Sequence, residues 1–225
     1  MWAHGSLAVS VRATSTATPL GVGQNFGGRL VTAANQLRIS PKVATTAGDA
    51  LVAIVEVRRN SGLTTVSSIS DSSGDVWFRA TSVHNGTEDE ELWYVAGAQS
   101  IPTSGKITIK TALSGAIAAT AVELQGIATG ASLDVTATSA GVSASPSIGP
   151  SAATIDANEI AIGDAGWRGA VTPSGQSGGY TLLPRQQSTV SGEGTGESAG
   201  VERESISPAE QHYLAAHPVN PDDPT

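Results

Sequence analysis

The stretch ATTAGDALVAIVEVR, residues 44–58, decides the fold, and a similar stretch, SAATIDANEIAIGDAGWR, follows at residues 151–168. Each stretch begins with Ala and Thr residues, passes through a short acidic turn and continues as an apolar run. Short apolar runs rich in β-branched residues are typical of strands that are buried on both faces. We therefore interpret the two stretches as central strands of two packed sheets, with a duplication of two related Greek-key halves as the alternative.

The composition favours an all-β protein. The chain has 225 residues, which is long enough for one all-β domain with a sizeable core. Only 14% of the residues are charged and 39% are hydrophobic, and the apolar residues gather in runs, so a disordered chain is excluded. Val, Ile and Thr, which fit a pleated sheet, are common, whereas the helix formers Lys, Glu and Leu are scarce.

Short apolar or alternating segments are separated by Gly, Pro, Asn and Asp residues, at spacings that are typical of a β-sandwich. The turn signals include DSSGD at residues 71–75 and NGTEDE at residues 85–90. We predict an antiparallel β-sandwich of the jelly-roll type with extended arms at both ends. The predicted strands cover residues 37–40, 51–57, 64–70, 76–84, 91–98, 105–113, 116–127, 133–141 and 159–167.

The two ends of the chain lack a strong strand pattern, apart from one short strand expected at residues 7–11. The region between the ends carries all the regular alternation. We therefore expect an extended N-terminal arm at residues 1–36, a β-sandwich domain at residues 37–190, and a C-terminal polar segment and tail at residues 191–225.

Three aromatic residues lie in these ends, where an isolated arm cannot bury them. Trp2 and Phe26 belong to the N-terminal arm, and Tyr213 belongs to the C-terminal segment. We predict that these three side chains dock against a partner.

The remaining tryptophans lie in predicted strands or at their ends. We interpret Trp77, Trp93 and Trp167 as core anchors, because large aromatic side chains dominate the burial of apolar surface. The alternative is a surface that stacks on sugars, formed by Trp93, Trp167 and Tyr180.

The net charge of −8 and the isoelectric point of about 4.9 exclude whole classes of partner. An acidic surface repels phosphate backbones and anionic membranes, so nucleic-acid binding is not expected. No apolar run approaches the roughly 18 residues of a membrane-spanning helix and no secretory signal is visible, so no membrane insertion is predicted. The absence of Cys excludes disulfides and thiolate metal sites.

No pattern of a catalytic or cofactor site is present. The segment GVGQNFGG, residues 21–28, lacks the spacing of dinucleotide and phosphate loops, and the HExxH and GxSxG motifs are absent. Glu56 and Glu123 lie inside apolar strands, and a facing pair of carboxylates would suggest a glycosidase, but no pattern places them together. We predict no enzyme activity, no cofactor and no metal ligands, and leave open whether the acidic residues 71–75 and 88–91 bind a cation.

Several motifs follow one another in a distinctive order. They are AGDALV at residues 47–52, DSSGDVW at 71–77, LWYVA at 92–96, VELQG at 122–126 and LDVTA at 133–137. In this order they resemble a β-sandwich module of actinobacteriophage virion structural proteins, most of them minor tail proteins, and of some bacterial surface proteins. The resemblance covers residues 37–183.

This resemblance implies a non-enzymatic virion structural protein, either a minor tail or a capsid decoration component. Its expected partners are other virion proteins and further copies of itself, with a trimer as the common state of such proteins. Its expected location is the virion, assembled in the host cytoplasm and released by lysis. The alternative is a carbohydrate-binding module for attachment to the host surface. The phage virion modules that this chain resembles usually close with one more apolar strand. We expect a neighbouring subunit to supply that strand at the sheet edge.

Overall fold

The computed structural model describes residues 4–12, 19–130, 132–141, 147–148, 152, 159–168, 172–176, 181–182, 186–187, 195–204 and 214–219, with side chains within residues 19–28, 31–130, 132–141, 152 and 159–166. In these ranges all regular elements are β-strands, and every strand pairing is antiparallel. The predicted all-β antiparallel class is therefore confirmed. The described residues contain no helix with the length and apolar character needed to cross a membrane.

The described strands are β1 (His4–Arg12), β2 (Gly21–Ile39), β3 (Ala50–Arg58), β4 (Val66–Asp71), β5 (Phe78–Asn85), β6 (Glu88–Val95), β7 (Ile107–Gln125), β8 (Leu133–Gly141), β9 (Ser147–Ile148), β10 (Glu159–Arg168), β11 (Thr172–Gln176), β12 (Thr181–Leu182), β13 (Gln186–Gln187), β14 (Thr195–Glu204) and β15 (Leu214–Val219). The β3 sheet has the order β2-β7-β3-β6-β5, and β4 also pairs with β7. The β10 sheet has the order β12-β14-β10-β1-β8, and β13 also pairs with β14. A small third sheet has the order β11-β15-β9.

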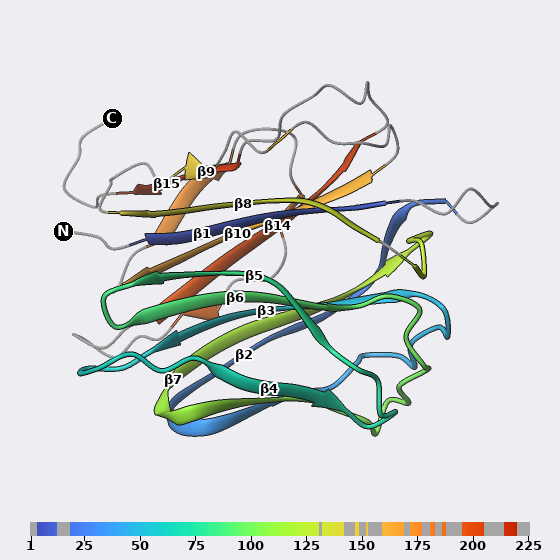
Figure 1. Cartoon of the computed structure of the whole chain (residues 1–225), viewed down its shortest axis with the longest axis horizontal. Coiled ribbons are helices and arrows are strands. Elements are labelled where there is room, and N and C mark those ends of the chain that lie inside the picture. The colour runs from blue at the N-terminus through green and yellow to red at the C-terminus, as the bar shows by residue number, and fades with distance from the viewer. Residues whose placement is uncertain are drawn as a thin grey trace.

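Each of the two similar stretches in the sequence forms the central strand of one large sheet. β3 lies between β7 and β6, and β10 lies between β14 and β1. The two sheets form separate layers in Figure 1, and one core cluster joins Val52 and Ile54 of β3 to Ile160 and Ile162 of β10. This packing is consistent with the predicted sandwich. It accounts for the repetition, because each sheet needs a buried strand at its centre.

The opposite face of β3 is also buried, because β2 and β7 are long and bent. Residues 116–124 of β7 pair with β3. Residues 107–111 at the start of β7 pair with β4, which lies below β3 in Figure 1. Ile107 and Ile109 from this lower part join Leu51 and Val55 of β3 in a second core cluster. Every residue of β3 is consequently buried, as a continuous apolar run predicts.

Two segments that were expected in an N-terminal arm belong to the sheets, which corrects that expectation. β1 lies between β8 and β10, and residues 21–36 are part of β2, which pairs with β7. The β2–β7 ladder has four register shifts, each of which interrupts the alternation of inward and outward side chains. The interrupted alternation explains why this strand could not be recognised by a period of two.

The partner-docking role expected for Phe26 is wrong, since this side chain is 6% exposed and belongs to the second core cluster. The C-terminal polar segment also differs from expectation, because β14 pairs with β10 along its whole length. Its sequence TGESAGVERE has a weak intrinsic preference for strand, and the tertiary context of a central partner strand overrides it. Trp2 and Tyr213 lie outside the described residues.

Asp71 organises the turn between β4 and β5. Its Oδ1 accepts hydrogen bonds from the backbone N–H groups of Ser73 and Gly74, both at 2.8 Å, and of Asp75 at 3.3 Å. Its Oδ2 accepts a hydrogen bond from the indole N–H of Trp77 at 2.7 Å. The Trp77 side chain is 7% exposed and belongs to the second core cluster. The carboxylate of Asp71 therefore serves as an internal acceptor that joins an Asx turn to the core.

The substitution Asp71→Ala is expected to lower the free energy of unfolding by about 2 to 3 kcal/mol, because several donors lose a charged acceptor at once. Urea denaturation followed by tryptophan fluorescence measures this loss. Ser70→Ala on the exposed face of β4 is the matched control, with an expected change within about 0.5 kcal/mol. Equal losses in the two variants would contradict the role of Asp71.

Candidate functional site

Four consecutive acidic residues, Glu88, Asp89, Glu90 and Glu91, form the first half of β6 and are 0 to 4% exposed. The sequence pattern placed the first three of them in a turn, so this is a correction. A charge run is ordinarily solvated, because moving an unpaired carboxylate out of water is costly. The run is buried here because side chains and backbone groups from distant parts of the chain surround it.

Glu90 points toward the β10 sheet and meets Glu56 and Asp164 there. Glu56 and Glu90 are opposite each other in the β3–β6 ladder, and the backbone N–H of Gly166 donates to Glu90 Oε2 at 3.2 Å. A Cβ atom added to Gly166 would lie 2.8 Å from Glu56 Cδ and 3.0 Å from Glu90 Oε2. Only a glycine at this position lets the carboxyl groups approach the backbone of β10.

The pKa shifts of Glu90 and Asp164 favour a proton between the two carboxyl groups inside this interface. Burial, followed by the charges of Asp164 and Glu56, raises the pKa of Glu90 well above its ordinary value. Burial also raises the pKa of Asp164 to about 7, although the hydrogen bond from Glu90 counteracts this rise. A protonated Glu90 supplies the donor that the Asp164 oxygens otherwise lack among the described residues. The pair thus joins β6 to β10 as a carboxyl–carboxylate contact.

Asp89 and Glu91 point to the opposite face of β6. Glu91 accepts hydrogen bonds from the backbone N–H of Val66 at 2.8 Å and the indole N–H of Trp93 at 2.9 Å, and it lies 3.3 Å from Arg79 Nη1. Asp89 Oδ1 lies 2.6 Å from His84 Nδ1. Burial, followed by the hydrogen bond and charge of Glu91, raises the pKa of Asp89 to about 9.

Glu56 and Glu123, the pair considered for glycoside hydrolysis, lie on opposite faces of the β3 sheet. Glu56 meets Gly166 of the β10 sheet, whereas Glu123 accepts the backbone N–H of Thr46 at 2.6 Å and Gln24 Nε2 at 2.7 Å. Burial, followed by the hydrogen bond and charge of Glu123, raises the pKa of the neighbouring Asp49 to about 6. The two glutamates therefore do not flank a common substrate.

The described part of the chain contains no group of three or more His, Cys, Asp or Glu residues arranged for a metal ion. Arg58 Nε lies 3.7 Å from Glu88 Oε1, which gives the first acidic residue of β6 a cationic neighbour. The acidic half of β6 thus has Arg58, Arg79 and His84 as neighbours.

Of the three residues considered for sugar stacking, Trp93 has a described side chain, so the structure does not test whether they form one surface. Trp93 is half-buried against the second core cluster, and its N–H is bonded to Glu91. The backbone of Trp167 pairs with β1 and β14, its side chain lies outside the described set, and Tyr180 lies outside the described residues.

An exposed apolar patch on the β5 edge was missed by the sequence analysis. Val76 is 68% exposed and Phe78 is 56% exposed, and the Phe78 ring lies 6.1 Å from the Tyr94 ring at an angle of 40°. The available signal was the alternation around Trp77: when Trp77 points into the core, its two apolar neighbours point outward.

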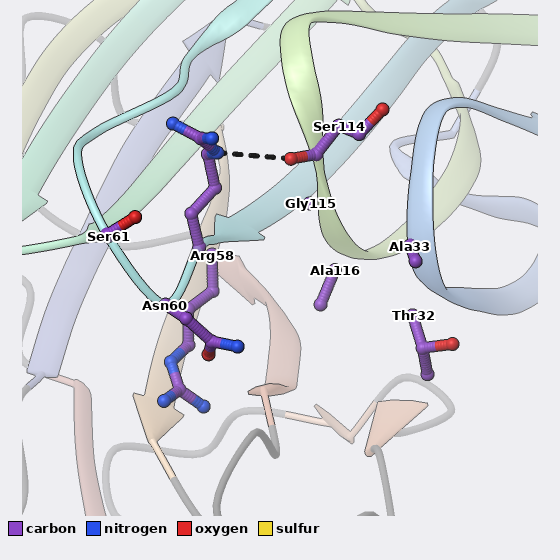
Figure 2. A pocket seen from close by; sticks show the side chains of 9 residues that line it. Thr32, Ala33, Arg58, Asn60, Ser61, Ser114, Gly115 and Ala116 are labelled. Atoms are coloured by element: carbon purple, nitrogen blue, oxygen red, sulfur yellow. Dashed lines mark hydrogen bonds between the residues drawn. The ribbon is translucent and has the colours of Figure 1, made fainter.

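A pocket of about 250 Å³ lies between the β3–β4 loop and the bend of β7. Asn60 and Ser61 form one wall, and Ser114, Gly115 and Ala116 form the facing wall (Figure 2). Arg59 Nε donates to the carbonyl oxygen of Ser114 at 3.1 Å, across the pocket. The remaining lining residues are Thr32, Ala33, Arg58 and Arg59. No sequence motif predicts this pocket, because its lining residues come from three separate segments of the chain, residues 32–33, 58–61 and 114–116.

The chain has no significant match to a family model, a curated protein or a solved structure.

Proposed function

We propose that the protein is a non-enzymatic structural subunit of a bacteriophage virion, a minor tail or capsid decoration component that binds other virion subunits. The observation that carries the proposal is a contrast in exposure: the acidic side chains are buried, whereas large apolar side chains at a sheet edge are exposed. The acidic residues of β6 are 0 to 4% exposed, whereas Val76 and Phe78 at the β5 edge are more than half exposed. Exposed apolar side chains beside a strand edge suit binding to another protein.

The motifs that carry the resemblance to phage virion proteins support this proposal through the places they occupy. The AGDALV motif leads into β3, the DSSGDVW motif is the Asp71 turn, and the LWYVA motif lies on β6. These residues serve packing and turn geometry, which suits a framework that carries binding surfaces.

The same proposal covers assembly and location. The subunit forms a homo-oligomer, with a trimer as the arrangement that the resemblance suggests, and joins the virion in the host cytoplasm before lysis. Among the described strands β5 pairs only with β6, so its other edge offers backbone groups for β-augmentation by a neighbouring subunit. The apolar patch of Val76 and Phe78 lies beside this edge.

The alternative is a carbohydrate-binding module for attachment to the host surface. The observation in its favour is the exposed Phe78 ring beside Tyr94, since aromatic faces stack on sugars. A glycan array probed with the purified protein separates the two functions. Binding to a glycan that is lost in Phe78→Ser would favour attachment over assembly.

The test of the proposed function is incorporation into particles. Particles released from cells that encode the chain are banded on a density gradient, and the chain is quantified by mass spectrometry. The double variant Val76→Ser, Phe78→Ser is expected to reduce incorporation at least about tenfold, a loss of about 1.4 kcal/mol in binding. Val43→Ser, which changes a residue of 58% exposure elsewhere, is the control and should be incorporated normally. Absence of the unmodified chain from banded particles would refute the proposal.

A further inference from the structure

We propose that the pocket between the β3–β4 loop and the β7 bend binds one carboxylate side chain, Asp or Glu, of a neighbouring protein subunit. The identity of that partner rests on the proposed function, whereas the affinity for a carboxylate does not. The inference starts from the described lining residues, which include two arginines and no acidic residue. In a chain of net charge −8, this makes the pocket a local site of positive charge.

Of the two arginines that line the pocket, Arg59 is the one that we expect to contact the carboxylate. Arg58 is 2% exposed and has Glu88 as a neighbour at 3.7 Å, so its charge is directed into the protein. Arg59 is half-buried, and its Nε donates to the Ser114 carbonyl oxygen at 3.1 Å. This bond leaves the two terminal amino groups, which have no hydrogen-bond acceptor among the described residues, for a bidentate contact with a carboxylate.

The backbone at two glycines lies close to the Arg59 side chain. Gly62 adopts a φ of +70°, and a Cβ atom there would lie 3.4 Å from Arg59 Nη1. A Cβ atom on Gly115 would lie 3.0 Å from Arg59 Cγ. The backbone thus encloses the side chain from the loop and from the β7 bend. A guanidinium that is already positioned loses less conformational entropy when a ligand binds.

The size and lining of the pocket favour a protein side chain over a sugar. Its volume of about 250 Å³ is below the roughly 300 to 1,000 Å³ of pockets for drug-sized ligands. The described lining contains no aromatic side chain on which a sugar ring would stack. Ser61 and Ser114 instead offer hydroxyl groups around the charge.

The test is a titration of the full-length, isotopically labelled protein with the peptide acetyl-Gly-Glu-Gly-amide, followed by NMR at constant ionic strength. The Arg59 Nε–H resonance is expected to shift in a saturable manner, and acetyl-Gly-Gln-Gly-amide should cause no such shift. Arg59→Gln is expected to weaken peptide binding at least tenfold, as followed on the backbone amides of Ser61 and Gly115. Arg38→Gln, which removes the same charge at an exposed position on β2, should leave binding unchanged.

Three outcomes would overturn the carboxylate site. They are the absence of saturable peptide binding to the unmodified protein, tighter binding of inorganic phosphate than of the peptide, and binding of glucuronate at least tenfold tighter than the peptide. The third outcome would identify an acidic glycan as the ligand. Because the first measurement uses the unmodified protein, it decides the question even where Arg59→Gln fails to fold.

Failure of this inference is distinguishable from failure of the proposed function. If Arg59→Gln enters particles as efficiently as the unmodified chain, the pocket has no role in assembly, while the proposed function stands. If the unmodified chain is absent from particles but binds the peptide, the proposed function fails and the carboxylate site stands.

Discussion

Replacing Gly166 by alanine is expected to destabilise the protein by about 3 kcal/mol, close to the upper end for overpacking a dense interior. The added methyl group would lie 2.8 Å from Glu56 Cδ and 3.0 Å from Glu90 Oε2, so both carboxyl groups would have to move. Neither has room to do so, because Glu56 and Glu90 are each 1% exposed. The free energy of unfolding in urea measures the effect.

Gly141→Ala is the matched control for this substitution. Gly141 lies on β8 of the same sheet, and a Cβ atom there would meet nothing within 4 Å. The control should change the free energy of unfolding by no more than about 0.5 kcal/mol. If Gly166→Ala were as mild as Gly141→Ala, the carboxyl groups would not be packed against β10.

The free energy of unfolding is expected to fall as the pH rises from about 4 to 7. Asp164 has an ordinary pKa of 3.8, and burial raises it to about 7 in the folded protein. Between these values the folded state holds a proton that the unfolded state releases, so stability is complete at low pH and is lost as the pH approaches 7. A shift of about three pKa units corresponds to a loss on the order of 4 kcal/mol. The raised pKa of Glu90 acts in the same direction.

Asp164→Asn tests this pH dependence, because it keeps the shape of the side chain and removes its titration. Urea denaturation at a series of pH values should show a markedly smaller loss for this variant between pH 4 and 7. Ser139→Ala, at an exposed position on β8 of the same sheet, removes no titrating group and should keep the slope of the unmodified protein. A stability that increases from pH 4 to 7 in the unmodified protein would refute a shared proton between β6 and β10.

The central strands could be predicted from the sequence because their signal is local. The run at residues 51–57 corresponds to β3 and the run at residues 159–167 corresponds to β10. The edge strand β8 was also predicted, at residues 133–141. Continuous apolar runs and turn residues act over a few positions, whatever the rest of the chain does. The bent strand β7 was predicted as two strands, since Ser114 and Gly115 at its bend resemble a turn.

Strands β2 and β14 and the acidic half of β6 could not be predicted, because their structure depends on partners that are distant in sequence. β2 is interrupted by register shifts, and β14 is polar and takes its conformation from pairing with β10. The acidic run of β6 resembles a solvated turn unless Arg79, Val66 and Asp164 are known to surround it.

The sequence by itself therefore determined the all-β class and the two central strands, since apolar runs and turn residues specify these within short windows. Only the tertiary structure decided which carboxylates are buried, which of them have a raised pKa and where Arg59 meets the β7 bend. The physical reason is the cost of burying a charge: it is offset by donors and protons that come from other strands, and no local pattern records them.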